Sequence, residues 1–135
     1  MTSIRTAAAA ILCATMLAGC GGGMLHPTGR VVKGGEPVVL KPGEDLGIFF
    51  YPLGGDGKLG TTVYPAFFNA ADSTFRVTGS DRRGLPPGKY RVAVELKKNK
   101  KDLFEGTYDM NNSPFVFDVD GKTAEILIDL SKPRG

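Results

Sequence analysis

The sequence is poor in the side chains on which most enzymes and metal sites depend. Its 135 residues include one histidine and two cysteines. The histidine, His26, stands close behind Cys20. Zinc sites and nucleophilic catalysis both rely on imidazole or thiolate groups, and no second imidazole is present to complete either arrangement. The composition therefore argues against a zinc site of the usual kind and against a Ser-His-Asp triad.

Neither sign of charge dominates, since 17 basic residues face 14 acidic ones. A nucleic-acid-binding domain is normally far more basic, so we expect no nucleic-acid partner. Long apolar runs are also missing. The run at 7–18 has about a dozen residues, whereas a membrane-spanning helix needs about 20. With Arg5 before it, this run predicts a signal peptide rather than a span.

A short motif closes the apolar run. It reads Leu17-Ala18-Gly19-Cys20 and resembles the bacterial lipobox. The resemblance implies cleavage before Cys20, a diacylglyceryl group on its sulfur and a further acyl chain, such as palmitate, on the new amine. Two or three chains hold a protein on a membrane stably, whereas one does so only marginally. The open alternative is an ordinary secretory signal cut after Ala18 or Gly19, which would leave a free thiol.

The motif divides the chain into three parts. Residues 1–19 are predicted to be removed as the signal peptide, 20–28 to form the lipidated cysteine and a flexible Gly-rich linker, and 29–135 to form the folded domain. Cys13 leaves with the leader, so no disulfide is expected and packing alone must stabilise the domain. Gly21 after the cysteine is compatible with outer-membrane delivery, by resemblance to Gram-negative lipoprotein sorting.

From residue 29 onward, apolar and polar residues alternate with a period of two. Tyr90, Val92 and Val94 share one face of such a stretch, as in a half-buried strand. Asp120-Gly121 separates the last two apolar stretches, which predicts a hairpin between them. No stretch has a helical period, so an all-β sandwich or barrel is expected. The predicted strands are 29–33, 36–41, 46–53, 60–64, 74–78, 90–97, 115–119 and 124–130.

Four stretches read GRVVKGGEPV (29–38), IFFYP (48–52), TFRV (74–77) and LPPGKYRVAV (85–94). Together they resemble small lipoproteins of planctomycete-type bacteria. The resemblance implies a single antiparallel β-sandwich of transthyretin-like (prealbumin-like, Ig-like) or carboxypeptidase-regulatory-like type behind a cysteine anchor. The family pattern names no catalytic residue.

The PPGKY turn has a physical explanation of its own. Two prolines favour an extended backbone, Gly88 allows a bend, and Tyr90 begins the best-patterned strand. A tyrosine there can bury its ring while its hydroxyl reaches back to the backbone of its own corner. We therefore predict a structural role for Tyr90.

The sequence does not match the residue spacing of a calcium-binding loop or a phosphate-binding loop. If Gly121 takes the glycine position of a calcium-binding loop, Val116 and Leu127 fall on ligand positions, which they cannot fill. The glycines at 54–57 lack the spacing of a phosphate loop and predict a hairpin tip instead. No pair of carboxylates stands out for glycoside hydrolysis. We expect no enzyme activity, no metal and no cofactor.

Two basic stretches are candidate contact sites. Lys97, Lys98, Lys100 and Lys101 concentrate four charges at the end of the best-patterned strand. Such a run is either a solvated loop or a contact for anionic lipid, acidic envelope polymer or a protein partner. The tip at 81–83 is a weaker, mobile candidate of the same kind.

The predicted function is that of an envelope lipoprotein, lipid-anchored on the periplasmic or outer face of a bacterial membrane. Its domain would act as a non-enzymatic binding or scaffolding module for an envelope protein or polymer. The alternative is a carrier of a small apolar or sugar ligand at one end of the sandwich, using Tyr51, Tyr64 or Phe68. Phe49-Phe50-Tyr51 and Phe67-Phe68 fit core strands as well as a pocket. The choice of membrane and the oligomeric state stay open.

Overall fold

The computed structural model describes residues 23–131, so the predicted signal peptide and Cys20 lie outside the described residues. Within residues 23–131 there are nine strands and no helix, which confirms the all-β prediction. The strands are β1 (Thr28–Lys33), β2 (Glu36–Pro37), β3 (Asp45–Pro52), β4 (Tyr64–Asn69), β5 (Thr74–Val77), β6 (Gly88–Lys98), β7 (Lys101–Asp102), β8 (Val116–Val119) and β9 (Ile126–Asp129).

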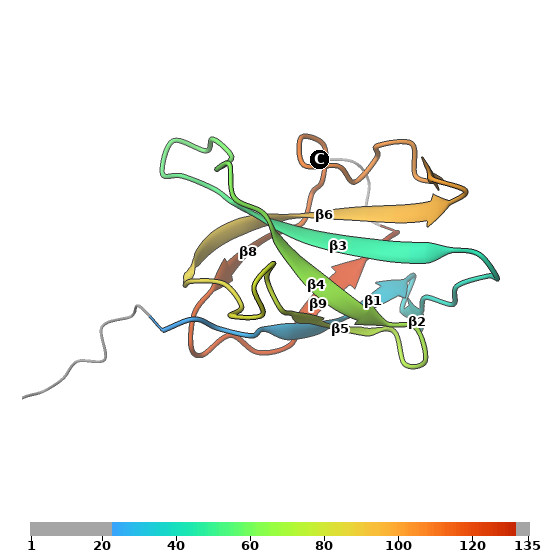
Figure 1. Ribbon diagram of the computed structural model, residues 1–135, viewed down its shortest axis with the longest axis horizontal. Helices are drawn as coiled ribbons and strands as arrows, with labels where there is room; N and C mark the ends of the chain where they lie inside the picture. Colours follow the sequence, from blue (N-terminus) through green and yellow to red (C-terminus); the bar gives the residue numbers. More distant parts are fainter. Residues whose placement is uncertain (1–22, 132–135) are drawn as a thin grey trace, which may run out of the picture.

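All the strands belong to one continuous sheet that curls over itself. The order of hydrogen-bonded neighbours is β2-β1-β5-β4-β3-β6-β7, with β9 added beside β1 and β8 beside β6. In Figure 1, β3 and β6 form an upper wall, β1, β5 and β9 form a lower wall, and β4 crosses diagonally between them. A sheet curled in this way encloses its inner face, so the core lies between the two walls.

The inner face is built mainly by alternation, although Ala93 in β6 and Val32 in β1 are buried as well, at 4% and 7% exposed. In β3, Leu46, Ile48 and Phe50 are at most 3% exposed. The same parity in β6 buries Val92 and Val94 completely. The apolar positions therefore select which face of each strand turns inward. The other core residues include Val31, Phe75, Val77, Leu85, Tyr90, Tyr108, Phe115, Val119, Ile126, Ile128 and Leu130.

The predicted tyrosine corner is confirmed. Tyr90 is 2% exposed, and its hydroxyl donates a hydrogen bond to the carbonyl of Pro86 at 2.5 Å. Its ring meets Phe50 and Tyr64 edge to face, with centroids 6.1 and 6.0 Å apart. Burial, and to a lesser extent the neighbouring Tyr64, raises the pKa of Tyr90 to about 12. The corner thus fixes the first residues of β6 against the core.

The predicted hairpin between 115–119 and 124–130 is wrong. β8 pairs antiparallel with β6, whereas β9 pairs parallel with β1, with Gly29 opposite Ile126. The turn itself exists, because Asp120 accepts from the N–H of Lys122 at 2.8 Å. It carries the chain from the upper wall to the lower one instead of reversing it within a wall. A turn motif fixes a change of direction, but the free sheet edges decide the pairing partner.

Two other strand predictions need correction. The stretch 60–64 is part of a loop, and the strand begins at Tyr64 and runs to Asn69. In that register Tyr64, Ala66 and Phe68 pack against the core. The predicted strand 36–41 shortens to Glu36–Pro37. Beyond it, the carbonyl of Val38 accepts a hydrogen bond from the hydroxyl of Ser73, so a side chain takes over from the strand ladder.

Candidate functional site

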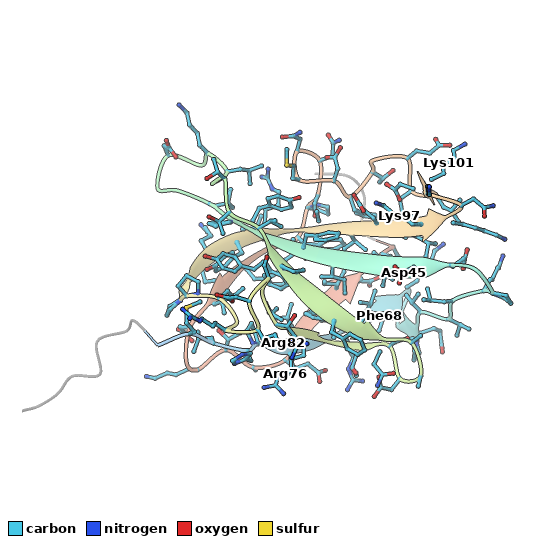
Figure 2. All side chains as sticks on the ribbon, in the orientation of Figure 1. Asp45, Phe68, Arg76, Arg82, Lys97 and Lys101 are labelled. Carbon is cyan, nitrogen blue, oxygen red and sulfur yellow. The ribbon has the colours of Figure 1, made fainter. Side chains whose placement is uncertain are left out.

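The four predicted lysines lie on a tight hairpin, which we call the lysine hairpin (97–102). Lys97 lies opposite Asp102 and Lys98 opposite Lys101, leaving a two-residue turn between β6 and β7. The turn residues Asn99 and Lys100 have φ values of 53° and 65°. Positive φ at both positions matches the twist of the flanking strands. All four lysines are exposed, and Figure 2 shows Lys97 and Lys101 at the far end of β6.

Acidic side chains from the same end offset part of this charge. Lys97 Nζ lies 3.3 Å from Glu95 Oε2, and Asp45 is the register partner of Lys97 on β3. The carboxylate of Asp102 is occupied by backbone N–H groups, including that of Phe104 at 3.0 Å.

Three lysines of the hairpin remain available to bind an acidic partner. Within the described part of the chain, Lys98, Lys100 and Lys101 form no ion pair. The hairpin therefore presents three cations on a fixed backbone rather than on an unstructured loop.

The opposite end of the fold holds Leu25 and His26. Leu25 forms a two-way bridge with Leu85, with N–O distances of 2.7 and 2.9 Å. A ring nitrogen of His26 lies 3.2 Å from the carbonyl oxygen of Arg82. The chain is thus attached to the body of the fold at Leu25, four residues before the predicted start of the domain at 29.

The tip at 81–83 is held against this attachment. Gly84 has a φ of 86°, and a Cβ added there would lie 2.0 Å from the carbonyl oxygen of Leu25. Gly79, with a φ of 71°, is similarly crowded by the backbone of Gly84. Arg83 pairs with Asp81 at 3.6 Å at the exposed tip. Only glycine fits such close backbone approaches, so these two positions fix the tip beside Leu25.

The aromatic residues of the carrier hypothesis do not form one site. Tyr64 packs edge to face on Tyr90, and Phe68 packs against the core. Tyr51 alone of the three lines a surface hollow of about 610 Å³, together with Arg91. Burial, and to a lesser extent Glu95 and Asp109, raises the pKa of Tyr51.

Arg91, beside Tyr51, has a buried Nε without a hydrogen-bond partner within residues 23–131. Because protein atoms enclose this Nε, a ligand in the hollow cannot reach it. The unpaired nitrogen therefore does not mark a ligand contact.

A second surface was missed by the sequence reasoning. The outer face of the lower wall carries a groove of about 270 Å³, which we call the Phe67 groove. Phe67 is 66% exposed there. Tyr64, Ala66 and Phe68 pack against the core, so the pleat turns Phe67 outward. The predicted strand 60–64 ended before Phe67, so its alternation could not be applied to this residue. The side chains around the groove include Thr28, Phe67, Asn69, Thr74, Arg76 and Glu125.

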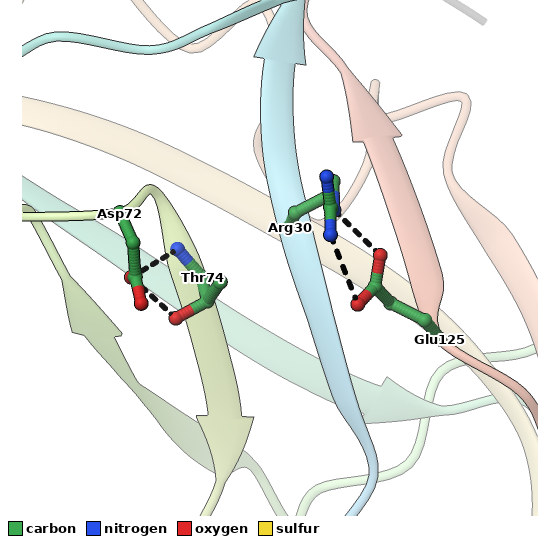
Figure 3. Close-up of polar contacts among 4 residues, drawn as sticks. All are labelled: Arg30, Asp72, Thr74 and Glu125. Carbon is green, nitrogen blue, oxygen red and sulfur yellow. Dashed lines mark hydrogen bonds and ion pairs between the residues drawn. The ribbon is translucent and has the colours of Figure 1, made fainter.

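Two polar pairs, drawn in Figure 3, fix two residues of the Phe67 groove, Glu125 and Thr74. The guanidinium of Arg30 on β1 donates to Glu125, with Nε–Oε1 at 2.6 Å. Asp72 accepts from both the backbone N–H and the hydroxyl of Thr74, at 3.1 and 2.6 Å. These bonds, led by the one from the Thr74 hydroxyl, lower the pKa of Asp72. Glu125 and Thr74 are therefore held in defined orientations at the rim.

No group of three or more histidine, cysteine or acidic residues within 23–131 is placed to hold a metal ion. The same residues include no helix long and apolar enough to cross a membrane.

Comparison with known proteins finds no matching family model, no matching curated protein and no matching solved structure. The transthyretin-like and lipoprotein assignments therefore stay predictions from the sequence.

Proposed function

We propose that this chain is a membrane-anchored envelope lipoprotein whose β domain is a non-enzymatic binding or scaffolding module. Cys20 carries the lipid, and the lysine hairpin contacts an acidic protein or polymer. One observation supports this division of roles. Leu25, which is bridged to Leu85, and the lysine hairpin lie at opposite ends of β6 (Figure 1).

The attachment at Leu25 limits how far the fold can move from the anchor. Only the four residues 21–24 separate Cys20 from Leu25 in the sequence. The five Cα–Cα steps between them span at most about 17 Å in an extended chain. β6 begins near Leu85 and runs for 11 residues, which is about 33 Å of strand. A lipid on Cys20 thus keeps the Leu25 end near the membrane, whereas the lysine hairpin projects away from it.

This geometry limits which kinds of partner the lysine hairpin can contact. A basic segment feels anionic headgroups only within about a Debye length of the surface, which is about 8 Å at physiological salt. The lysine hairpin lies farther than that from the anchoring membrane when the domain stands on its Leu25 end. An acidic polymer or protein beyond the membrane surface is therefore the partner that the proposal names.

The test is carboxylate-directed crosslinking with a dihydrazide in intact cells that make the full chain, followed by mass spectrometry, since the lysine variants keep all their carboxylates. The variant replaces Lys98, Lys100 and Lys101 by Gln. Its matched control replaces three exposed lysines elsewhere, Lys58, Lys89 and Lys122, by Gln, so the net charge changes equally. We expect one enriched neighbour that the control keeps and the hairpin variant loses. If both variants keep the same neighbour, the lysine hairpin is not the binding site and that part of the proposal is wrong.

The anchor is tested separately. Cys20→Ala should move the protein from the membrane fraction to the soluble fraction without changing its melting temperature. A variant that still sediments with membranes would contradict the assignment of Cys20.

The carrier alternative has less support. It needs several of Tyr51, Tyr64 and Phe68 around one cavity, whereas two of them pack against the core. The hollow beside Tyr51 stays a candidate only for a ligand held by a single aromatic ring.

A further inference from the structure

The outer face of the lower wall carries an exposed aromatic ring in line with polar side chains. Phe67 on β4 lies opposite Arg76 on β5, and Arg76 lies opposite Thr28 on β1. Gly29 pairs with Ile126, so Glu125 lies at the end of the same row. Because register partners in a sheet share a face, the row crosses β4, β5 and β1 as one surface and ends at Glu125, directly before β9.

The polar groups of the Phe67 groove, which include Asn69 from the neighbouring register row, have unused hydrogen-bonding capacity. Within the described residues, the guanidinium of Arg76 forms no ion pair, and Figure 2 shows it projecting from the lower wall. Asn69 accepts from the N–H of Ala71 at 3.0 Å through Oδ1, which leaves its amide donors facing solvent. Glu125 is held by Arg30 at 2.6 Å, so its charge is already offset. The cation without a partner in the groove is therefore Arg76.

We propose that the Phe67 groove binds an acidic saccharide, with a sugar ring stacked on Phe67 and its carboxylate on Arg76. A pyranose presents an apolar C–H face and a rim of hydroxyls, which matches an exposed ring bordered by amide, hydroxyl and carboxylate groups. The planar guanidinium accepts a carboxylate with two parallel hydrogen bonds. Asn69 and Glu125 are placed to donate to and accept from the sugar hydroxyls.

The size and shape of the surface favour this ligand over a folded partner. A groove of about 270 Å³ lies below the range of pockets for drug-sized molecules, about 300–1,000 Å³, and fits a single ring of a longer chain. Phe67 at one end of the row is 66% exposed and the Glu125 side chain at the other is 47% exposed, so neighbouring sugars of a polymer can continue across the wall. A protein interface would need a larger apolar centre than one phenyl ring.

This inference goes beyond the proposed function, because the groove lies on a different surface from the lysine hairpin and does not involve the anchor. The experiment measures binding of trigalacturonate and of neutral galactotriose to the full chain in detergent micelles by isothermal titration calorimetry. We expect trigalacturonate to bind at least tenfold more tightly than galactotriose. No saturable binding of trigalacturonate up to roughly 10 mM would overturn the proposal.

Two exposed substitutions separate the roles of the ring and the cation. Phe67→Ala should weaken trigalacturonate binding at least tenfold, and Arg76→Gln should reduce it to the level of the neutral probe. Leu127→Ala is the matched control, since Leu127 is also an exposed apolar residue of this wall, at 53%, but lies outside the groove. Equal losses from Leu127→Ala and Phe67→Ala would contradict a specific site.

Two further outcomes assign the surface differently and reject the saccharide. If binding survives Phe67→Ala but is lost on replacing Lys98, Lys100 and Lys101 by Gln, the acidic probe belongs to the hairpin. If Phe67→Ala instead changes the oligomeric state in size-exclusion chromatography, the groove is an interface between copies. Unchanged melting temperatures of the variants show that each measurement is made on folded protein.

Discussion

The two ends of the curled sheet are built in different ways. At the end near Leu25, the chain before β1, the 81–83 tip and the Tyr90 corner interlock through backbone bridges and close glycine contacts. At the other end, the lysine hairpin is joined to the sheet by the pairing of Lys97 with Asp45, and its four lysines are exposed to solvent. The comparison shows that the Leu25 end is built to hold the chain firmly, whereas the lysine hairpin is built to present positive charge to solvent. Substitutions at the Leu25 end should therefore cost much more stability than equivalent ones at the hairpin.

Tyr90→Ala should have the largest effect. Removing the buried ring leaves a cavity against Phe50 and Tyr64 and deletes the hydrogen bond to Pro86. We expect the free energy of unfolding to fall by about 3–5 kcal/mol, measured by urea denaturation. Lys101→Ala at the hairpin, as the control, should change it by less than about 0.5 kcal/mol. Similar losses in the two variants would contradict the contrast between the ends.

A pair of glycines compares the ends more closely. Gly84 and Gly43 both have positive φ, 86° and 83°, but a Cβ at Gly84 would meet the backbone of Leu25, whereas at Gly43 it would meet only the end of Lys98 at 3.9 Å. We expect Gly84→Ala to cost about 3 kcal/mol and Gly43→Ala about 1 kcal/mol. Equal melting temperatures for the two variants would show that the contact with Leu25 does not matter.

The raised pKa of Tyr90 predicts a pH dependence confined to the corner. The fold favours the neutral hydroxyl, so its contribution is fully present below pH 10, the ordinary value, and is lost as the pH rises from about 10 to about 12. Unfolding at a series of pH values should show a steeper loss for the natural chain than for Tyr90→Phe in this window. Parallel curves would mean that Tyr90 ionises equally easily in the folded and unfolded chains.

The smallest effect is expected at the hairpin turn. Lys100 has a φ of 65°, which a residue with a Cβ adopts at some cost and glycine adopts freely. Lys100→Gly should raise the free energy of unfolding by about 0.5 kcal/mol, because the relieved strain is partly offset by the greater freedom of glycine in the unfolded chain. Differential scanning calorimetry would detect this as a slightly higher melting temperature. A lower value would show that the lysine stem contributes packing at the tip.

The features predicted correctly from the sequence are local. The Tyr90 corner spans five residues, Pro86 to Tyr90, whose own geometry brings the hydroxyl near the carbonyl. The predicted strands 29–33 and 36–41 leave only Gly34-Gly35 between them, and both glycines have positive φ, 61° and 86°, as short hairpin connections require. The exposure of the lysines at 97–101 followed from charge alone. In each case the residues that determine the feature are neighbours in the chain.

The features that were wrong or missed depend on residues far apart. The turn at Asp120-Gly121 is real, but β8 and β9 pair with β6 and β1, whose edges only the complete sheet makes available. The Phe67 groove joins side chains between Thr28 and Glu125 in the sequence, and no spacing in the chain announces it.

By itself, the sequence determined the all-β class, the inward face of most strands and the position of the corner. Alternation and turn chemistry act over a few residues, so they can be read without the rest of the molecule. Only the tertiary structure decided that the last two strands lie on opposite walls, that Leu25 lies far from the lysine hairpin, and that Phe67 and Arg76 share a groove. Those relations arise when distant strands compete for the same edges and bury a common core, and that competition has no local signature.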